Sequence, residues 1–182
     1  MPLGYHITWG TYGARLHGDS RGTVDRAHNE YGTPVLGRDP EREQLERANL
    51  KFPPVKLDVE KRLFIESVIP SICARGHWKH IVDAAGPDYV HAVVSAPFDP
   101  EVIRRLLKRW LGQELSTRWP LPTGATWWAE DGSIRWLMDQ RYLGNATRYV
   151  RDQRATPPPV LPVDDFAFDL DITPRFPTGE GR

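Results

Sequence analysis

The chain has 182 residues, of which 40% are hydrophobic, so it is long enough for one domain with a core and too short for two large ones. Its 24 basic and 24 acidic residues balance, so net charge indicates no partner, and its single cysteine, Cys73, excludes an internal disulfide and a thiolate metal cluster. The sequence shows no signal-peptide pattern and no apolar stretch near the roughly 18 residues of a membrane span, so we expect a soluble, cytoplasmic protein without membrane contact.

The first third of the chain predicts one strand and a long insertion. Residues 5–12 are aromatic and β-branched and stop at a glycine, which is typical of a strand. Residues 13–57 are rich in Gly, Pro and Arg, so we expect a loop insertion with at most a short helix at 41–48. Long ordered loops tend to be functional.

The middle of the chain predicts a helix followed by a hairpin. Apolar residues recur at four-residue intervals in the segment 58–76, which indicates a helix, although Pro70 should kink it. Two short apolar runs, 77–85 and 89–96, are separated by Gly-Pro-Asp, which predicts two strands joined by a turn.

The last part of the chain predicts two helices with short strands between them. A helix opens after Asp99 with proline and an acid in its first turn. Tryptophan-rich segments at 126–128 and 133–137 predict short strands, and a final helix is expected from about 139 to 154. The Pro-rich acidic residues 157–182 predict an extended tail.

This order of elements predicts an α+β fold. Strand, helix, strand, strand, helix, strand, helix is the pattern of a ferredoxin-like split βαβ antiparallel sheet with an added C-terminal helix, here within residues 1–156. Such a sheet has an open face, and that face is a common place to bind nucleic acid.

Two segments far apart in sequence carry residues with useful chemistry. Tyr149 and Gln153 are four residues apart, so on a helix they share one face, as a phenol nucleophile beside an amide oxygen that can hold a cation. His91 lies on one face of the strand at 89–96. Taken alone, the pair could be a half-buried aromatic and a surface amide, and His91 a core histidine.

Together these segments resemble the HUH-type single-tyrosine transposases, including the REP-associated tyrosine transposases. That family carries a His-hydrophobic-His triplet on a strand, which matches residues 87–95, and a Tyr with Gln four residues later on the final helix, which matches Tyr149 and Gln153. Residues 5–9 resemble the first strand of the family, and residues 128–137 resemble its Trp-rich strand before the catalytic helix.

The resemblance implies DNA recombination chemistry. Tyr149 would attack a backbone phosphate of single-stranded DNA, form a covalent 5′-phosphotyrosine and free a 3′-hydroxyl, and a later strand would reverse the step. A phenol of pKa near 10 is ionised about one part in a thousand at neutral pH, so it needs activation. In the family, Mg²⁺ or Mn²⁺ held by the histidines and by the glutamine polarises the phosphate, which implies His91 and Gln153 as metal ligands here.

The sequence departs from the family at the first histidine of the triplet, where it has Tyr89. A neutral phenol is a poor ligand for a hard cation, and losing even a supporting residue around a metal costs roughly 10 to 100-fold in affinity. We therefore expect metal binding to be weak or lost. Asp88 is an oxygen ligand beside the gap, but on a regular strand it points to the other face.

Basic and aromatic residues supply candidate nucleic-acid contacts, each with a plainer alternative. The basic candidates are Arg104, Arg105, Lys108 and Arg109 on the helix after Asp99, and Arg148 and Arg151 beside Tyr149. They could instead be solvated helix faces. The tryptophans Trp127, Trp128 and Trp136 are expected in the core, with base stacking as the alternative. We expect four other histidines to lie at the surface or at edges: His6, His17, His77 and His80.

Two functions remain open at this point. The first is a transposase-like DNA strand transferase acting on single-stranded or hairpin DNA. The second is a non-catalytic domain of the same descent that binds structured nucleic acid and does not cut it. Tyr89 favours the second and the Tyr149–Gln153 pair favours the first. A homodimer is compatible with both.

Overall fold

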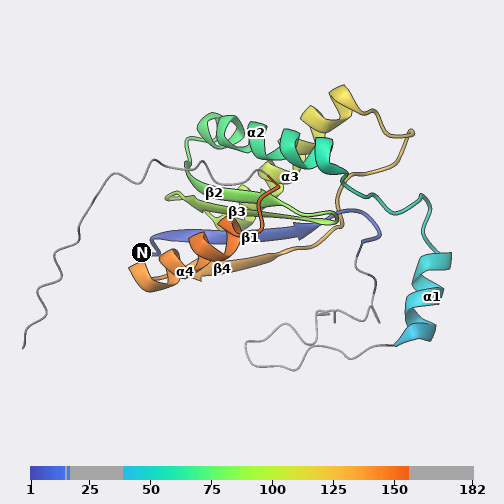
Figure 1. Ribbon diagram of the computed structural model, residues 1–182, viewed down its shortest axis with the longest axis horizontal. Helices are drawn as coiled ribbons and strands as arrows, with labels where there is room; N and C mark the ends of the chain where they lie inside the picture. The colour runs from blue at the N-terminus through green and yellow to red at the C-terminus, as the bar shows by residue number, and fades with distance from the viewer. Residues whose placement is uncertain (15, 17–38, 156–182) are drawn as a thin grey trace, which may run out of the picture.

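A four-stranded antiparallel sheet organises the chain in a computed structural model, which describes residues 1–14, 16 and 39–155 (Figure 1). The strands are β1 (Gly4–Gly10), β2 (Lys79–Ala85), β3 (Tyr89–Ser95) and β4 (Ser133–Leu137), in the spatial order β2-β3-β1-β4. Each neighbouring pair is antiparallel. This is the predicted split βαβ arrangement, and the predicted α+β class is confirmed.

An aspartate caps the N-terminus of each described helix. They are α1 (Pro40–Ala48), α2 (Val59–Arg75), α3 (Pro100–Arg118) and α4 (Gln140–Arg151). The side chain of the preceding aspartate accepts a hydrogen bond from a backbone N–H of the first turn in every case: Asp39, Asp58, Asp99 and Asp139. Such caps satisfy amide groups that have no partner inside the helix, so the sequence fixes these starting points locally.

One face of the sheet packs against α2 and α3 and forms the main core. The alternation along β1 sends Tyr5, Ile7 and Trp9 to this face, where they meet Leu107 of α3 and other buried residues. Cys73 of α2 belongs to the same core, as predicted, and burial raises the pKa of its thiol to about 12. The thiol is therefore an inert packing group.

The other face of the sheet carries α4, which lies across the strands on the side away from α2 and α3 (Figure 1). Val150 is fully buried in a small second cluster with Val82, Val93 and Leu137. The alternate residues of β1 point to this side. The face that the sequence predicted to be open is therefore covered in part by the last helix.

Three further sequence predictions have different outcomes. Residues 126–128 form no strand, and only an isolated bridge joins Trp128 to Thr11. Helix α2 continues through Pro70, which is exposed, and is capped at Gly76, in agreement with the predicted segment 58–76. The tail at 157–182 and most of the insertion lie outside the described residues, although α1 matches the short helix expected within that insertion. Among the described helices none has the length and apolarity of a membrane span.

The division into core and surface predicts different outcomes for two leucines in helices. Leu107 in α3 has no exposed surface, whereas Leu45 in α1 is 66% exposed. We expect Leu107→Ala to lower the free energy of unfolding by roughly 2 to 5 kcal/mol, because it leaves a cavity in the core. The matched Leu45→Ala should change it by about 0.5 kcal/mol or less. Urea unfolding followed by circular dichroism measures both, and equal effects would contradict the assigned core.

Candidate functional site

The candidate site lies where α4 crosses β1 and β3. His6 and Thr8 come from β1, His91 comes from β3, and Tyr149 comes from α4. The β1–β3 register sets Thr8 directly opposite His91, so residues 83 positions apart meet on one face of the sheet. The strand alternation that buries Ile7 and Trp9 on the other side therefore also builds this site.

Two imidazoles and a hydroxyl form a compact polar group at the site. His6 Nε2 lies 3.1 Å from His91 Nδ1, and Thr8 Oγ1 lies 2.7 Å from His91 Nδ1 and 3.4 Å from His6 Nε2. Two facing ring nitrogens at hydrogen-bond distance need one proton between them, so one ring donates and the other accepts. Thr8 adds a group that can do either.

Tyr149 covers this pair from α4. Its ring centroid lies 5.6 Å from that of His91 and 6.0 Å from that of His6, both edge to face. The side chain is 54% exposed, so the phenol is open to solvent while its ring rests against the imidazoles. The structure thus brings together Tyr149 and His91, which the sequence singled out, and adds His6.

Gln153 takes a different position from the one expected. Helix α4 ends at Arg151, and the N–H of Gln153 donates to the carbonyl of Val150 in a turn just beyond the helix. The phenol of Tyr89 donates a 2.8 Å hydrogen bond to Gln153 Oε1. Gly86 in the hairpin makes room for this tyrosine, because a Cβ there would lie 2.2 Å from Cζ of the Tyr89 ring. Tyr89 is therefore hydrogen-bonded to the amide oxygen that the sequence predicted to be a metal ligand.

These residues do not fit a site for Mg²⁺ or Mn²⁺. Hard divalent cations need several oxygen ligands, usually with carboxylates among them. In residues 1–14, 16 and 39–155 no three or more His, Cys, Asp and Glu side chains converge on a point that could hold a metal ion. The Gln153 amide oxygen is engaged by Tyr89, and the Asp88 carboxylate is paired with Lys56 at 3.2 Å.

His6 is a buried histidine and not the surface or edge residue expected from the sequence. It is 9% exposed, and burial, with a smaller contribution from the positive charge of Arg135, lowers the pKa of its imidazole to about 4. His6 is therefore neutral near pH 7. The alternation of Tyr5, His6, Ile7 and Thr8 was the signal that could have placed His6 on the same face as His91.

The basic residues of α3 lie on the other side of the sheet. Their helix packs in the main core, on the face of the sheet opposite α4, so it does not flank Tyr149. Lys108 Nζ donates to the carbonyls of Ala129 and Glu130 at 2.6 Å, and Arg104 donates to the carbonyl of Gly132 at 2.6 Å. Burial lowers the pKa of Lys108. These two side chains hold the loop before β4, while Arg105 and Arg109 are exposed.

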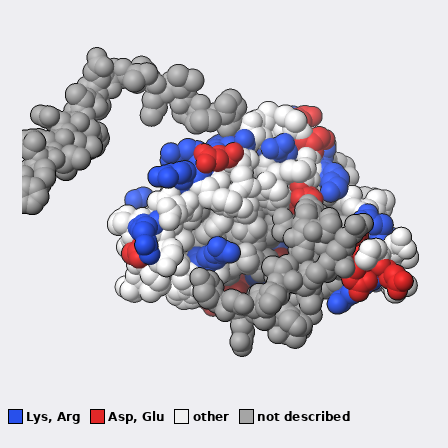
Figure 2. Space-filling view, turned by 60° about the horizontal axis from the view of Figure 1, so that its bottom comes forward, with Lys and Arg blue, Asp and Glu red and all other residues white. Residues whose placement is uncertain are grey.

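Three exposed arginines lie on α4 or on β4, the strand next to β1. Arg148 and Arg151 are exposed on α4, and their contact with nucleic acid stays a prediction. Arg135 of β4, which the sequence argument missed, is exposed and sits directly opposite His6 in the β1–β4 register. Figure 2 shows basic side chains in separate groups with acidic ones among them, so positive charge is local to such positions and does not form one continuous surface in that view.

Comparison with known proteins adds little beyond this geometry. No protein-family model matches the chain, and no curated protein matches it. Among solved structures, the chain is similar to one described as "a putative transposase" from Deinococcus radiodurans R1, with 15% sequence identity and a TM-score of 0.45. The match covers 86% of this chain and 94% of that one, but it is too weak to carry an argument about function.

The environment of His6 predicts a pH effect with a definite sign. Because the pKa of His6 is lowered from 6.5 to about 4 in the folded chain, the unfolded chain binds the proton first. The resulting contribution to stability is present above pH 6.5 and is lost as the pH falls towards 4. We expect His6→Gln to weaken the dependence of the free energy of unfolding on pH between 6.5 and 4.

A second variant tests the cause of the shift. We expect Arg135→Ala to raise the pKa of His6 without restoring it to 6.5, because burial is the larger cause of the lowered pKa. Histidine NMR titration measures the second effect, and an unchanged pKa would contradict it.

Proposed function

We propose that this protein binds single-stranded or hairpin DNA on the α4 side of its sheet and that Tyr149 cuts and rejoins the strand as a transposase-like nucleophile. The observation that carries the proposal is the half-exposed phenol of Tyr149 lying against the His6–His91 pair. A tyrosine held for packing alone would have its ring in the core, as Tyr5 has.

The chemistry follows from the groups present. The Tyr149 oxygen attacks phosphorus and forms the Tyr–O–P bond, while the P–O3′ bond breaks and a free 3′-hydroxyl leaves. The phenol proton passes to the imidazole pair, which returns a proton to the departing 3′-oxygen. A 3′-hydroxyl from another strand reverses these steps. Within the pair this transfer falls to the His91 imidazole, because burial lowers the pKa of His6 to about 4 and keeps His6 neutral as the hydrogen-bond partner of His91.

Positive charge for the phosphate comes from guanidinium groups in this proposal. Arg135 is exposed on β4 opposite His6, and Arg148 and Arg151 are exposed on α4, the helix that carries the nucleophile. Arginine binds phosphate through two parallel hydrogen bonds and keeps its charge at all physiological pH values. The proposal uses no step at a metal ion, because the described residues do not fit one.

A covalent-adduct assay tests the nucleophile. Wild-type protein incubated with hairpin-flanked single-stranded DNA should give a protein–DNA adduct that is stable to denaturation, with or without EDTA. Tyr149→Phe should abolish it, because the attacking oxygen is gone. Tyr142→Phe is the matched control, since Tyr142 is on the same helix and 51% exposed. An adduct that survives Tyr149→Phe, or that is lost in both variants, would contradict the assignment.

A second function is favoured by the Tyr89–Gln153 hydrogen bond. This contact engages the amide oxygen that the resembling family uses for metal, so the protein could bind structured DNA without cutting it. Its signature would be DNA affinity that falls steeply with salt, together with no adduct under any condition.

Replacing Tyr89 with histidine separates the two functions. Tyr89→His removes the donor to Gln153 Oε1 and adds an imidazole on the same strand face as His91. We expect this variant to bind Mn²⁺ at least tenfold more tightly than the wild type, measured by calorimetry. Adduct formation that appears only in Tyr89→His with Mn²⁺ would show that the natural chain is a binding module. Tyr89→Phe is the control, since it frees Gln153 without adding a ligand.

A further inference from the structure

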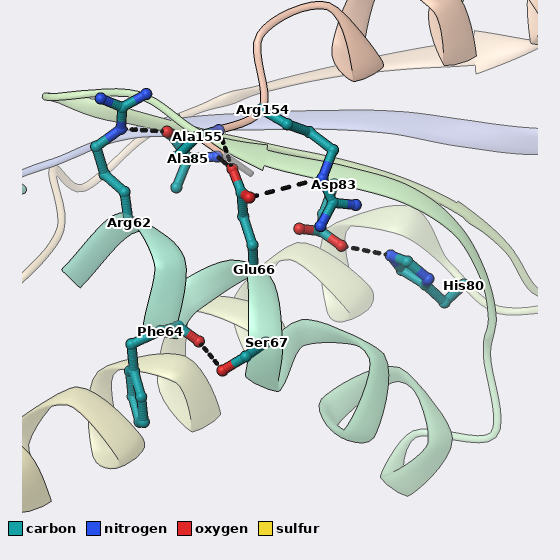
Figure 3. A network of polar contacts seen from close by, with 9 residues as sticks. All are labelled: Arg62, Phe64, Glu66, Ser67, His80, Asp83, Ala85, Arg154 and Ala155. Atoms are coloured by element: carbon teal, nitrogen blue, oxygen red, sulfur yellow. Dashed lines mark hydrogen bonds and ion pairs between the residues drawn. The ribbon is translucent and has the colours of Figure 1, made fainter. Parts of the chain in front are cut away.

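The chain leaving α4 is anchored to a helix on the opposite face of the sheet. Ala155 follows Gln153 by two residues, and its backbone N–H donates a 2.7 Å hydrogen bond to Oε1 of Glu66 in α2. Oε2 of Glu66 faces Nε of Arg154 at 3.6 Å. Figure 3 shows Ala155, Arg154 and the Glu66 carboxylate converging beside the sheet. Neither contact belongs to the packing of α4 itself.

Glu66 also binds the edge of the sheet. The same oxygen, Oε1, accepts the backbone N–H of Ala85 at 3.1 Å, and Arg62, one helical turn earlier, donates from Nε to the Ala85 carbonyl at 2.7 Å (Figure 3). Ala85 ends β2, which is an edge strand of the sheet. The carboxylate therefore joins α2, β2 and the segment after α4 at one point.

Burial makes this junction a specific one. Glu66 is 3% exposed, although it lies in the middle of a helix whose neighbouring polar residues face solvent. A charged carboxylate is rarely this buried unless it is paired and hydrogen-bonded. Hydrogen bonds to a charged acceptor are also stronger than those between neutral groups.

We propose that Glu66 is a positioning residue for the candidate site: it clamps the segment 152–155, and through it fixes Gln153 against Tyr89 and the last turn of α4 over the imidazole pair. Only Val150 of α4 is fully buried, so packing alone holds this helix weakly. The clamp supplies a fixed point a few residues beyond Tyr149. The importance of Glu66 for strand cleavage rests on the function proposed above, whereas its effect on the helix does not.

Removing the charge of Glu66 tests the clamp by NMR and hydrogen exchange. In the wild type, the Tyr149 ring should show NOEs to the imidazole protons of His6 and His91. In Glu66→Gln these NOEs should weaken or vanish, and amides in the last turn of α4 should exchange roughly tenfold or more faster, because a charged hydrogen-bond acceptor is lost. Amides of Ile7 and Val93 in the central strands should be unchanged.

Glu60→Gln is the matched control. Glu60 lies on the same helix, and its exposed carboxylate pairs with Arg118. This variant should leave both the NOEs and the exchange rates as in the wild type. Unchanged α4 signals in Glu66→Gln, or equal changes in both variants, would overturn the proposal.

Arg154→Ala covers the case in which Glu66→Gln loosens the whole sheet. This change removes the guanidinium group that faces Glu66 and leaves the hydrogen bonds of the carboxylate with the N–H groups of Ala85 and Ala155. Faster exchange confined to α4, reversed in Arg154→Lys, would support the clamp, and no change in α4 would overturn it. If the wild-type protein shows these NOEs but forms no DNA adduct, the result would contradict the cleavage function and would not affect the proposed role of Glu66.

Discussion

The two-residue alternation of strand β1 is the constraint on which the rest of the molecule depends. Its odd-numbered residues, Tyr5, Ile7 and Trp9, fill the main core, and its even-numbered residues, His6 and Thr8, face α4. Because a shift of one residue in register would exchange these two sets, the burial of a tryptophan on one side holds an imidazole in place on the other. Core and candidate site are thus fixed by the same hydrogen-bonded ladder.

The sequence predicted the elements well because their signals are local. Aspartate caps, the Gly-Pro-Asp turn and runs of β-branched residues set the helix starts and the hairpin without reference to the rest of the chain. The strand predicted at 126–128 is absent because its tryptophans pack in the core instead of pairing in the sheet. Trp127 and Trp128 are buried against α3, where their indole N–H groups donate to Ser116 and to the carbonyl of Lys108.

The candidate site was predicted in part, and the missing parts depend on tertiary contacts. Tyr149 was found from its spacing to Gln153 and His91 from its place on a predicted strand. The contact of His6 with His91 arises from pairing between β1 and β3, which no local pattern encodes. The face of the sheet against which α3 packs could have been inferred from the predicted order of elements. Right-handed crossovers place α2 and α3 on the same face, which leaves the other face to α4 and separates Lys108 from Tyr149. The burial of Glu66 and its contact with the segment after α4 could not be predicted, because a glutamate in a helix is ordinarily a surface residue.

The neutral state of His6 has a consequence for how the site would attract a polyanion. A histidine that gains charge as the pH falls makes a binding surface more positive in mildly acid conditions. Here burial prevents His6 from doing so until well below that range, and the neighbouring cation, Arg135, is a guanidinium whose charge is permanent. The charge that His6 and Arg135 contribute to this part of the surface is therefore the same in mildly acid and mildly alkaline conditions, and dissolved salt screens it.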